Sequence, residues 1–140
     1  MKLVLPYPVS ANRYWRSFVP KGHKRAIVCV SDEAKAYKQQ VGLVARVAGV
    51  RKPFEHLVEL RLRLVPANGV CMDLDNALKV TIDALKGIAY ADDKQVWRIV
   101  ADRGEADGNA RMEVEVLELA APEPKQQALP LVRELAAEPF

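Results

Sequence analysis

The segment from Leu57 to Val65 alternates strictly between apolar and charged side chains. One set consists of Val58, Leu60, Leu62 and Leu64, and the other of Glu59, Arg61 and Arg63. Successive side chains of a β-strand point to opposite faces, so this pattern predicts a strand with one buried and one solvated face. We therefore expect this strand to belong to a sheet whose apolar face is covered by a second layer of secondary structure.

Two stretches have the three-and-four spacing of helices that can form this layer. The first begins after Ser31, an N-cap residue followed by two acids that favour a helix N-terminus, and Gly49 ends it. Its apolar stripe is Ala34, Tyr37, Val41, Val44 and Ala48. The second is expected from about Asp73 to Lys86 and is stopped by Gly87. Its apolar stripe is Leu74, Leu78, Ile82 and Leu85.

Further strands are expected at residues 2–5, 27–30, 96–101 and 111–119. The last two flank a loop that contains Asp107-Gly108, which favours a hairpin. Residues 9–26 are expected to form a long loop. The order is approximately β-(β)-α-β-α-β-β. This order predicts the α+β class, as a two-layer sandwich in which a mixed sheet carries the two main helices on one face.

The length of 140 residues fits one domain. We expect residues 1–119 to form it and residues 120–140 to be an appended tail with a short helix at 127–137. No apolar run is long enough to cross a membrane, and the proline at position 6 interrupts any signal-like start. We therefore expect a cytoplasmic protein in which Cys29 and Cys71 are reduced thiols.

Charge is distributed unevenly along the chain. Residues 1–31 contain no acid and six basic residues: Lys2, Arg13, Arg16, Lys21, Lys24 and Arg25. The rest of the chain has 15 basic and 18 acidic residues, a net charge of −3 within an overall +3. This segregation points to a polyanionic partner, although a solvated basic surface is the ordinary alternative. Trp15 and Phe18 in this segment either stack on unpaired bases or pack beneath the loop.

Two acidic pairs lie at the ends of the expected elements. Asp73 and Asp75 stand where a loop enters the second helix, and Asp92 and Asp93 precede the 96–101 strand. Carboxylates suit Mg²⁺, whereas zinc prefers His and Cys and the chain has only two unclustered histidines. The alternatives are a cap for Asp73, a surface ion pair between Asp75 and Lys79, and a solvated turn at 92–93.

Together, the acidic pairs, Lys79 one turn beyond Asp75, and the basic segment describe metal-assisted cleavage of a phosphodiester. The basic segment would hold phosphates, the ion would polarise the scissile phosphate and activate water, and Lys79 would offset developing charge. The glycine-rich phosphate loop, the dinucleotide fingerprint and the serine nucleophile elbow are all absent from the sequence.

The same residues resemble the RusA-type Holliday junction resolvases of bacteria and phages. Four segments carry the resemblance, in the expected order: Leu5-Pro6-Tyr7-Pro8 leading to Asn12-Arg13; Val30-Ser31 with Ala36-Tyr37-Lys38; Asp73-Leu74-Asp75-Asn76-Ala77-Leu78-Lys79 with Asp83-Ala84-Leu85; and Asp92-Asp93-Lys94-Gln95-Val96. They cover residues 5 to about 119, so residues 1–119 are expected to be the RusA-like nuclease domain.

The resemblance implies a homodimeric endonuclease that uses Mg²⁺, with Mn²⁺ as a substitute, to nick opposing strands of a four-way DNA junction. It implies that Asp73, Asp75 and Asp93 are metal-binding catalytic acids, that Asp92 supports them, and that Lys79 is the essential lysine. The expected DNA contacts are Asn12, Arg13, Arg16, Lys21, Lys24 and Arg25. No organic cofactor and no membrane partner is expected. A two-fold dimer also matches the symmetry of such a junction, and Trp97 is expected in the core or the dimer interface.

One departure is that residues 69–72 are uncharged, where members of the family often carry basic residues. The main alternative is a branched-DNA-binding protein without catalytic activity. Retention of all four aspartates and Lys79 argues against it. A nucleotide-sugar transferase with an Asp-x-Asp metal site is the third hypothesis, but the chain is too short for that fold and the basic segment would have no purpose there.

Overall fold

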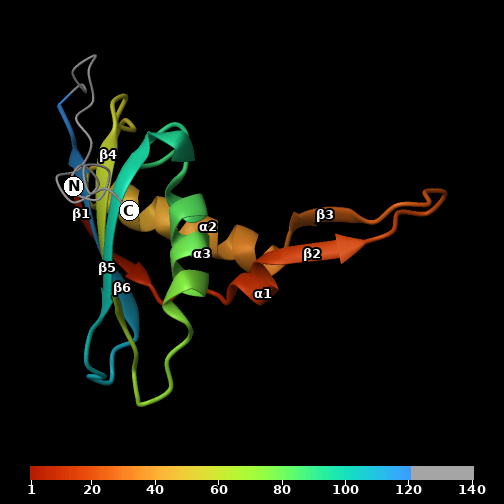
Figure 1. The fold of residues 1–140 in the computed structure, drawn as a ribbon, viewed down its shortest axis with the longest axis horizontal. Coiled ribbons are helices and arrows are strands. Elements are labelled where there is room, and N and C mark those ends of the chain that lie inside the picture. The colour runs from red at the N-terminus through yellow and green to blue at the C-terminus, as the bar shows by residue number, and fades with distance from the viewer. Residues whose placement is uncertain (121–140) are drawn as a thin grey trace, which may run out of the picture.

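The computed structural model describes residues 1–120. Its strands are β1 (Lys2–Pro6), β2 (Trp15–Phe18), β3 (Ile27–Val30), β4 (Val58–Val65), β5 (Val96–Arg103) and β6 (Arg111–Glu118). Its helices are α1 (Ala11–Tyr14), α2 (Asp32–Val47), α3 (Leu74–Leu85) and the 3-10 turn η1 (Asp93–Gln95). Figure 1 shows α2 and α3 on one side of the larger sheet, while β2 and β3 project away from it. The predicted α+β class is confirmed, and the expected helix at 127–137 lies outside the described residues.

The larger sheet has the order β1-β6-β4-β5 and is mixed, as predicted. Strand β5 pairs in parallel with β4, and β6 pairs antiparallel with both β4 and β1. The predicted hairpin between the last two strands is therefore wrong. The crossover through α3 places β5 on one side of β4, so β6 occupies the other side, which was still free.

Strand β4 has the predicted alternation, with one exception on its open face. Glu59 is only 5% exposed although it lies on the charged side of the strand. Its carboxylate accepts hydrogen bonds from Arg61 Nε at 2.9 Å and from Arg98 Nη1 at 3.2 Å. These two guanidinium groups cover the acid, which explains how a charged residue is tolerated at this depth.

Helix α2 begins as predicted, because the Ser31 hydroxyl oxygen accepts a hydrogen bond from the Ala34 amide. Ala34, Tyr37 and Val41 are buried, but the last buried position is Ala45 and not Ala48. The helix ends at Val47, and Gly49 adopts a left-handed φ of +88° that turns the chain away. Ala48 is exposed because it lies beyond the last helical turn.

Helix α3 occupies the expected position but buries a different face. The buried residues are Ala77, Val80, Thr81, Ala84 and Leu85, whereas Leu74, Leu78 and Ile82 are half-buried. Small side chains let the helix approach its neighbours closely, so the face that carries them is buried in place of the larger leucine stripe. The leucine side of α3 therefore remains partly open to solvent.

The segment 9–26, predicted to be one long loop, contains a helix and a strand in its first half. It contains α1 and then β2, which pairs antiparallel with β3 from Trp15↔Val30 to Phe18↔Ile27. We call residues 15–30 the arm; it projects from the body in Figure 1. Its base is tied by the Ser31 amide, which donates to Tyr14 O at 2.8 Å, and by the Ser31 hydroxyl, which donates to Arg13 O.

Within residues 1–120, no helix is long and apolar enough to cross a membrane. This agrees with the absence of a suitable apolar run in the sequence.

Tyr14 tests the packing at the base of the arm. Its side chain is fully buried, and its hydroxyl has no hydrogen-bond partner among residues 1–120. We expect Tyr14→Phe to leave the free energy of unfolding unchanged or to raise it, because the mutation removes a buried, unsatisfied polar group. Tyr14→Ala should cost about 3–5 kcal/mol. Urea unfolding measures both, and a loss above about 1 kcal/mol for Tyr14→Phe contradicts this account.

Candidate functional site

Asp73 and Asp75 lie at the N-terminal end of α3 with exposed side chains. Asp73 occupies the N-cap position, but its carboxylate makes no capping hydrogen bond. The ion pairs formed within residues 1–120 do not include one between Asp75 and Lys79. The two structural alternatives for this pair, a cap and a surface ion pair, are therefore not what the structure shows.

The backbone just before Asp73 is fixed by two side chains from other parts of the chain. The Met72 amide donates to the Tyr7 hydroxyl at 3.1 Å, and that hydroxyl donates to Cys71 Sγ at 3.7 Å. Burial is the main reason that the pKa of Tyr7 is raised above its ordinary value. On the other side, Arg103 Nη2 donates to Met72 O at 3.4 Å. The far end of β5 therefore lies beside the start of α3.

The second acidic pair belongs to the η1 turn, where Asp92 acts as a cap. Its Oδ1 accepts a hydrogen bond from the Lys94 amide at 3.1 Å, and this bond is the main cause of its lowered pKa. Asp93 is exposed in the first turn of η1. Both residues therefore lie in a turn, as the turn alternative for 92–93 predicts: Asp92 caps it, and Asp93 is exposed within it.

Gln95 holds this turn in place with both ends of its amide. Its Oε1 accepts from the Ala91 and Asp92 amides, both at 2.9 Å. Its Nε2 donates to Phe54 O at 2.7 Å and to His56 O at 2.9 Å. A single side chain therefore connects the acidic turn to the segment that precedes β4.

The η1 turn lies at the C-terminal end of α3. The Tyr90 hydroxyl donates to Ile82 O, and the Gly87 amide donates to Tyr90 O at 2.6 Å. Asp83, in the last turns of α3, has a raised pKa, mainly through burial and to a lesser extent through the nearby Asp93 carboxylate, while Lys86 acts in the opposite direction. Asp83 and Lys86 therefore border the second acidic pair.

A single chain does not bring the two predicted acidic pairs together. Asp73 and Asp75 lie at the first turn of α3, and Asp92 and Asp93 lie beyond its last turn; the 12-residue helix is about 18 Å long at 1.5 Å per residue. Strand β5 also separates the two pairs. It begins directly after η1, and its other end, at Arg103, contacts Met72 beside the first pair. Within residues 1–120, no three His, Cys, Asp or Glu side chains form a group that could hold a metal ion. Lys79 is exposed on α3, between the two pairs.

The predicted DNA contacts lie on the arm or at its base, and all are exposed: Asn12, Arg13, Arg16, Lys21, Lys24 and Arg25. None of the ion pairs found within residues 1–120 involves any of them. Trp15 and Phe18 are about two-fifths exposed, at 42% and 40%, and Arg16 lies over the Phe18 ring at 5.6 Å. Trp15 also makes an edge-to-face contact with the Tyr14 ring, with centroids 4.6 Å apart.

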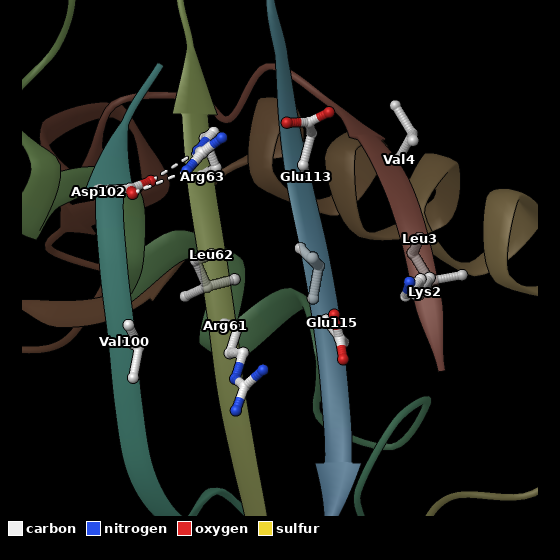
Figure 2. Close-up of a pocket in the computed structure, with 11 residues that line it drawn as sticks. Lys2, Leu3, Val4, Arg61, Leu62, Arg63, Val100, Asp102, Glu113 and Glu115 are labelled. Atoms are coloured by element: carbon white, nitrogen blue, oxygen red, sulfur yellow. Dashed lines mark hydrogen bonds and ion pairs between the residues drawn. The ribbon is translucent and has the colours of Figure 1, made fainter.

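A depression of about 460 Å³ lies on the open face of the sheet and away from these residues (Figure 2). It contains none of the predicted catalytic acids. Arg63 crosses it to bind Asp102 through two hydrogen bonds, of 2.9 and 3.0 Å. The charged residues that line this depression are therefore partly neutralised by one another. The depression is not the site that the sequence predicts.

Comparison with known proteins bears directly on the two acidic pairs and the arm. The sequence profile of the family described as Endodeoxyribonuclease RusA matches residues 6–117, which include all of them. The chain belongs to the RusA family. RusA, the crossover junction endodeoxyribonuclease of Escherichia coli K12, is 34% identical over 101 residues, covering 70% of this chain and 79% of that protein. The enzyme of the same name from Enterobacteria phage HK97 is 30% identical over 123 residues, covering 84% and 94%.

A second phage relative is similar to the same extent. The crossover junction endodeoxyribonuclease of Enterobacteria phage 82 is 32% identical over 101 residues, covering 70% of this chain and 79% of that protein. The RusA match confirms the family resemblance seen in the sequence motifs. It ends before the 120–140 segment, and the roles of individual residues remain predictions.

Two positioning residues were missed at the sequence level. Gln95 stands three residues after Asp92, which is the spacing of a capping box and a usable local signal. Tyr7 contacts a segment 65 residues away, so no local pattern identifies it.

Gln95 provides a test of how the acidic turn is held. We expect Gln95→Glu to lower the free energy of unfolding by about 1–3 kcal/mol, because the new carboxylate cannot donate to Phe54 O and His56 O. The matched control is Gln40→Glu, the same change at an exposed position of α2. Equal unfolding midpoints for the two variants would show that the Gln95 amide does not hold the turn.

Proposed function

We propose that this chain is a Mg²⁺-dependent endonuclease that resolves four-way DNA junctions by paired symmetric nicks, in recombination and repair. Membership of the RusA family carries this proposal, since the relatives are named crossover junction endodeoxyribonucleases. The sequence retains both acidic pairs and Lys79 within the matched region. Its bacterial and phage relatives also favour action on DNA in the cytoplasm.

The arm supports DNA as the partner through its charge and its isolation. It is acid-free, its cations are exposed, and they form no ion pairs with other residues of the 1–120 segment. A two-stranded hairpin is only marginally stable in water, so binding to a polyanion would both neutralise the charge of the arm and stabilise its folded form. Trp15 and Phe18 are exposed beside Arg16 and suit stacking on unpaired bases at a junction.

The metal proposal rests on the chemistry of the donors. Asp73 and Asp75 present exposed carboxylates without capping bonds, and Mg²⁺ commonly takes one or two carboxylates together with water and substrate phosphate. A bound Mg²⁺ supplies Lewis-acid activation of the phosphate and of water, and Mn²⁺ is the expected substitute. Tyr7 and Arg103 hold the preceding backbone, and the exposed Lys79 can approach the developing negative charge of the scissile group.

The decisive assay is cleavage of a labelled synthetic four-way junction, with linear duplex beside it. The wild-type chain should cut only the junction, and only with Mg²⁺ or Mn²⁺. Asp75→Asn should lose at least 100-fold in rate, because removing one ligand charge weakens metal activation by several kcal/mol. Glu105→Gln, an exposed loop acid, is the control and should cut normally.

The outcomes of this assay separate the two functional hypotheses. A wild-type chain that binds the junction with Mg²⁺ present but leaves it uncut is the catalytically silent DNA-binding protein. If Asp75→Asn cuts as fast as wild type, the enzyme assignment stands and the site assignment is wrong.

The arm is tested by the salt dependence of junction binding. Arg13→Ala with Arg16→Ala should weaken binding and reduce the slope of log K against log salt by about one unit per lost phosphate contact. The matched control is Arg46→Ala with Arg51→Ala, two exposed arginines outside the arm. Fluorescence anisotropy at several salt concentrations measures the slope, and an unchanged slope for the arm variant removes these arginines from the DNA interface.

A further inference from the structure

Strand β5 ends on Arg103, an exposed cation at the start of α3. Arg103 pairs in register with the buried Leu64, so its side chain lies on the helix side of the sheet. From there its Nη2 donates a hydrogen bond to Met72 O at 3.4 Å, one residue before Asp73. The guanidinium group therefore lies beside the first acidic pair.

The backbone at this corner of the molecule is held without the Arg103 side chain. The Gly108 amide donates to Ala67 O at 2.9 Å, so the loop after β5 is tied to the loop that leads into α3. Figure 1 shows both loops at the same end of the sheet. The Met72 amide is also held, by the Tyr7 hydroxyl at 3.1 Å. The bond from Arg103 is longer than either, so holding the backbone does not account for a charged side chain here.

The charge of Arg103 is not neutralised by the acids around it. None of the ion pairs found in the described part of the chain includes Arg103, although Asp73 directly follows the carbonyl that it contacts. Arg63, near the same end of the neighbouring strand β4, is instead bound by Asp102 through two hydrogen bonds. Arg103 therefore keeps most of its N–H donors, and its charge, for a ligand at this corner.

The charges at the start of α3 favour an anion once a divalent ion is bound. Asp73 and Asp75 together offset the positive charge of such an ion. Arg103, Lys79 and the positive end of the α3 dipole are then in excess. The loop at residues 67–72 contains no charged residue that could alter this balance. The excess matches a phosphodiester, whose oxygens become more negative as water attacks the phosphorus.

We propose that Arg103 is a further catalytic residue, whose guanidinium group binds a non-bridging oxygen of the phosphodiester that is cut. This inference rests on the proposed function and adds to it the side chain that holds the scissile phosphate. A planar guanidinium group matches the oxygens of a phosphate better than a lysine ammonium does. Arg103 stays protonated and forms no covalent bond, so it acts by orienting the phosphate and by offsetting its growing charge.

Cleavage and metal binding together separate a phosphate contact from a structural role. We expect Arg103→Ala to cut the four-way junction about 100-fold more slowly than wild type, because it loses a cation that is hydrogen-bonded to the reacting phosphate. Arg103→Lys should recover part of this loss, since it keeps the charge without the planar group. Arg63→Ala is the matched control and should cut normally. The affinity for Mn²⁺, measured by electron paramagnetic resonance without DNA, should not fall in any of these variants.

Two results of these measurements overturn the proposal. One is an Arg103→Ala chain that cuts as fast as wild type. The other is an Arg103→Ala chain whose affinity for Mn²⁺ falls by about as large a factor as its rate of cutting, because Arg103 then only holds the backbone that carries Asp73.

A modified junction tests the contact with the phosphate itself. The phosphodiester that the wild-type chain cuts is mapped and then replaced by a methylphosphonate, in which a methyl group takes the place of one non-bridging oxygen. Binding is measured by fluorescence anisotropy with Ca²⁺ in place of Mg²⁺, over a time too short for any strand to be cut. We expect wild type and Arg63→Ala to prefer the normal junction to one of the two diastereomers by about tenfold or more, and Arg103→Ala to lose most of this preference. An undiminished preference in Arg103→Ala overturns the contact.

These results also separate the inference from the proposed function. A wild-type chain that leaves the junction whole overturns both. A wild-type chain that cuts the junction, beside an Arg103→Ala chain that cuts it equally fast, keeps the function and overturns the role of Arg103 alone.

Discussion

The parallel pairing of β4 with β5 is the constraint on which the rest of the molecule depends. Parallel neighbours require a crossover, and α3 supplies it by running back along the sheet between them. The residues that enter α3 and those that follow it must therefore lie at opposite ends of the same layer. This places Asp73 and Asp75 far from Asp92 and Asp93, and it also places β6 between β1 and β4.

Local patterns in the sequence predicted where the strands and helices lie better than they predicted which elements pack or pair with one another. The alternation in β4 and the Ser31 cap were sufficient to locate a strand and a helix, because both depend on neighbouring residues. The hairpin between β5 and β6 was wrong because strand pairing is decided by the whole sheet, and Asp107-Gly108 only permits a turn. The buried face of α3 was also missed, because close packing favoured Ala77 and Ala84 over the larger Leu78.

The candidate site was predictable in its residue types but not in its assembly. The acidic pairs, Lys79 and the basic segment stand out in the sequence, and the family match includes them all. Their distances depend on the crossover, which no local pattern specifies. Gln95 and Tyr7 illustrate the same limit: each fixes an acidic segment through hydrogen bonds to residues 39 to 65 positions away.

The exposed carboxylates at the start of α3 are proposed to bind the Mg²⁺ with which this chain cleaves DNA junctions. The most direct test is the binding of Mn²⁺ by the wild-type protein and by Asp75→Asn, measured by electron paramagnetic resonance without DNA. We predict that the wild-type protein binds Mn²⁺ and that Asp75→Asn binds it at least tenfold more weakly. Equal Mn²⁺ affinity of the two proteins would contradict this site.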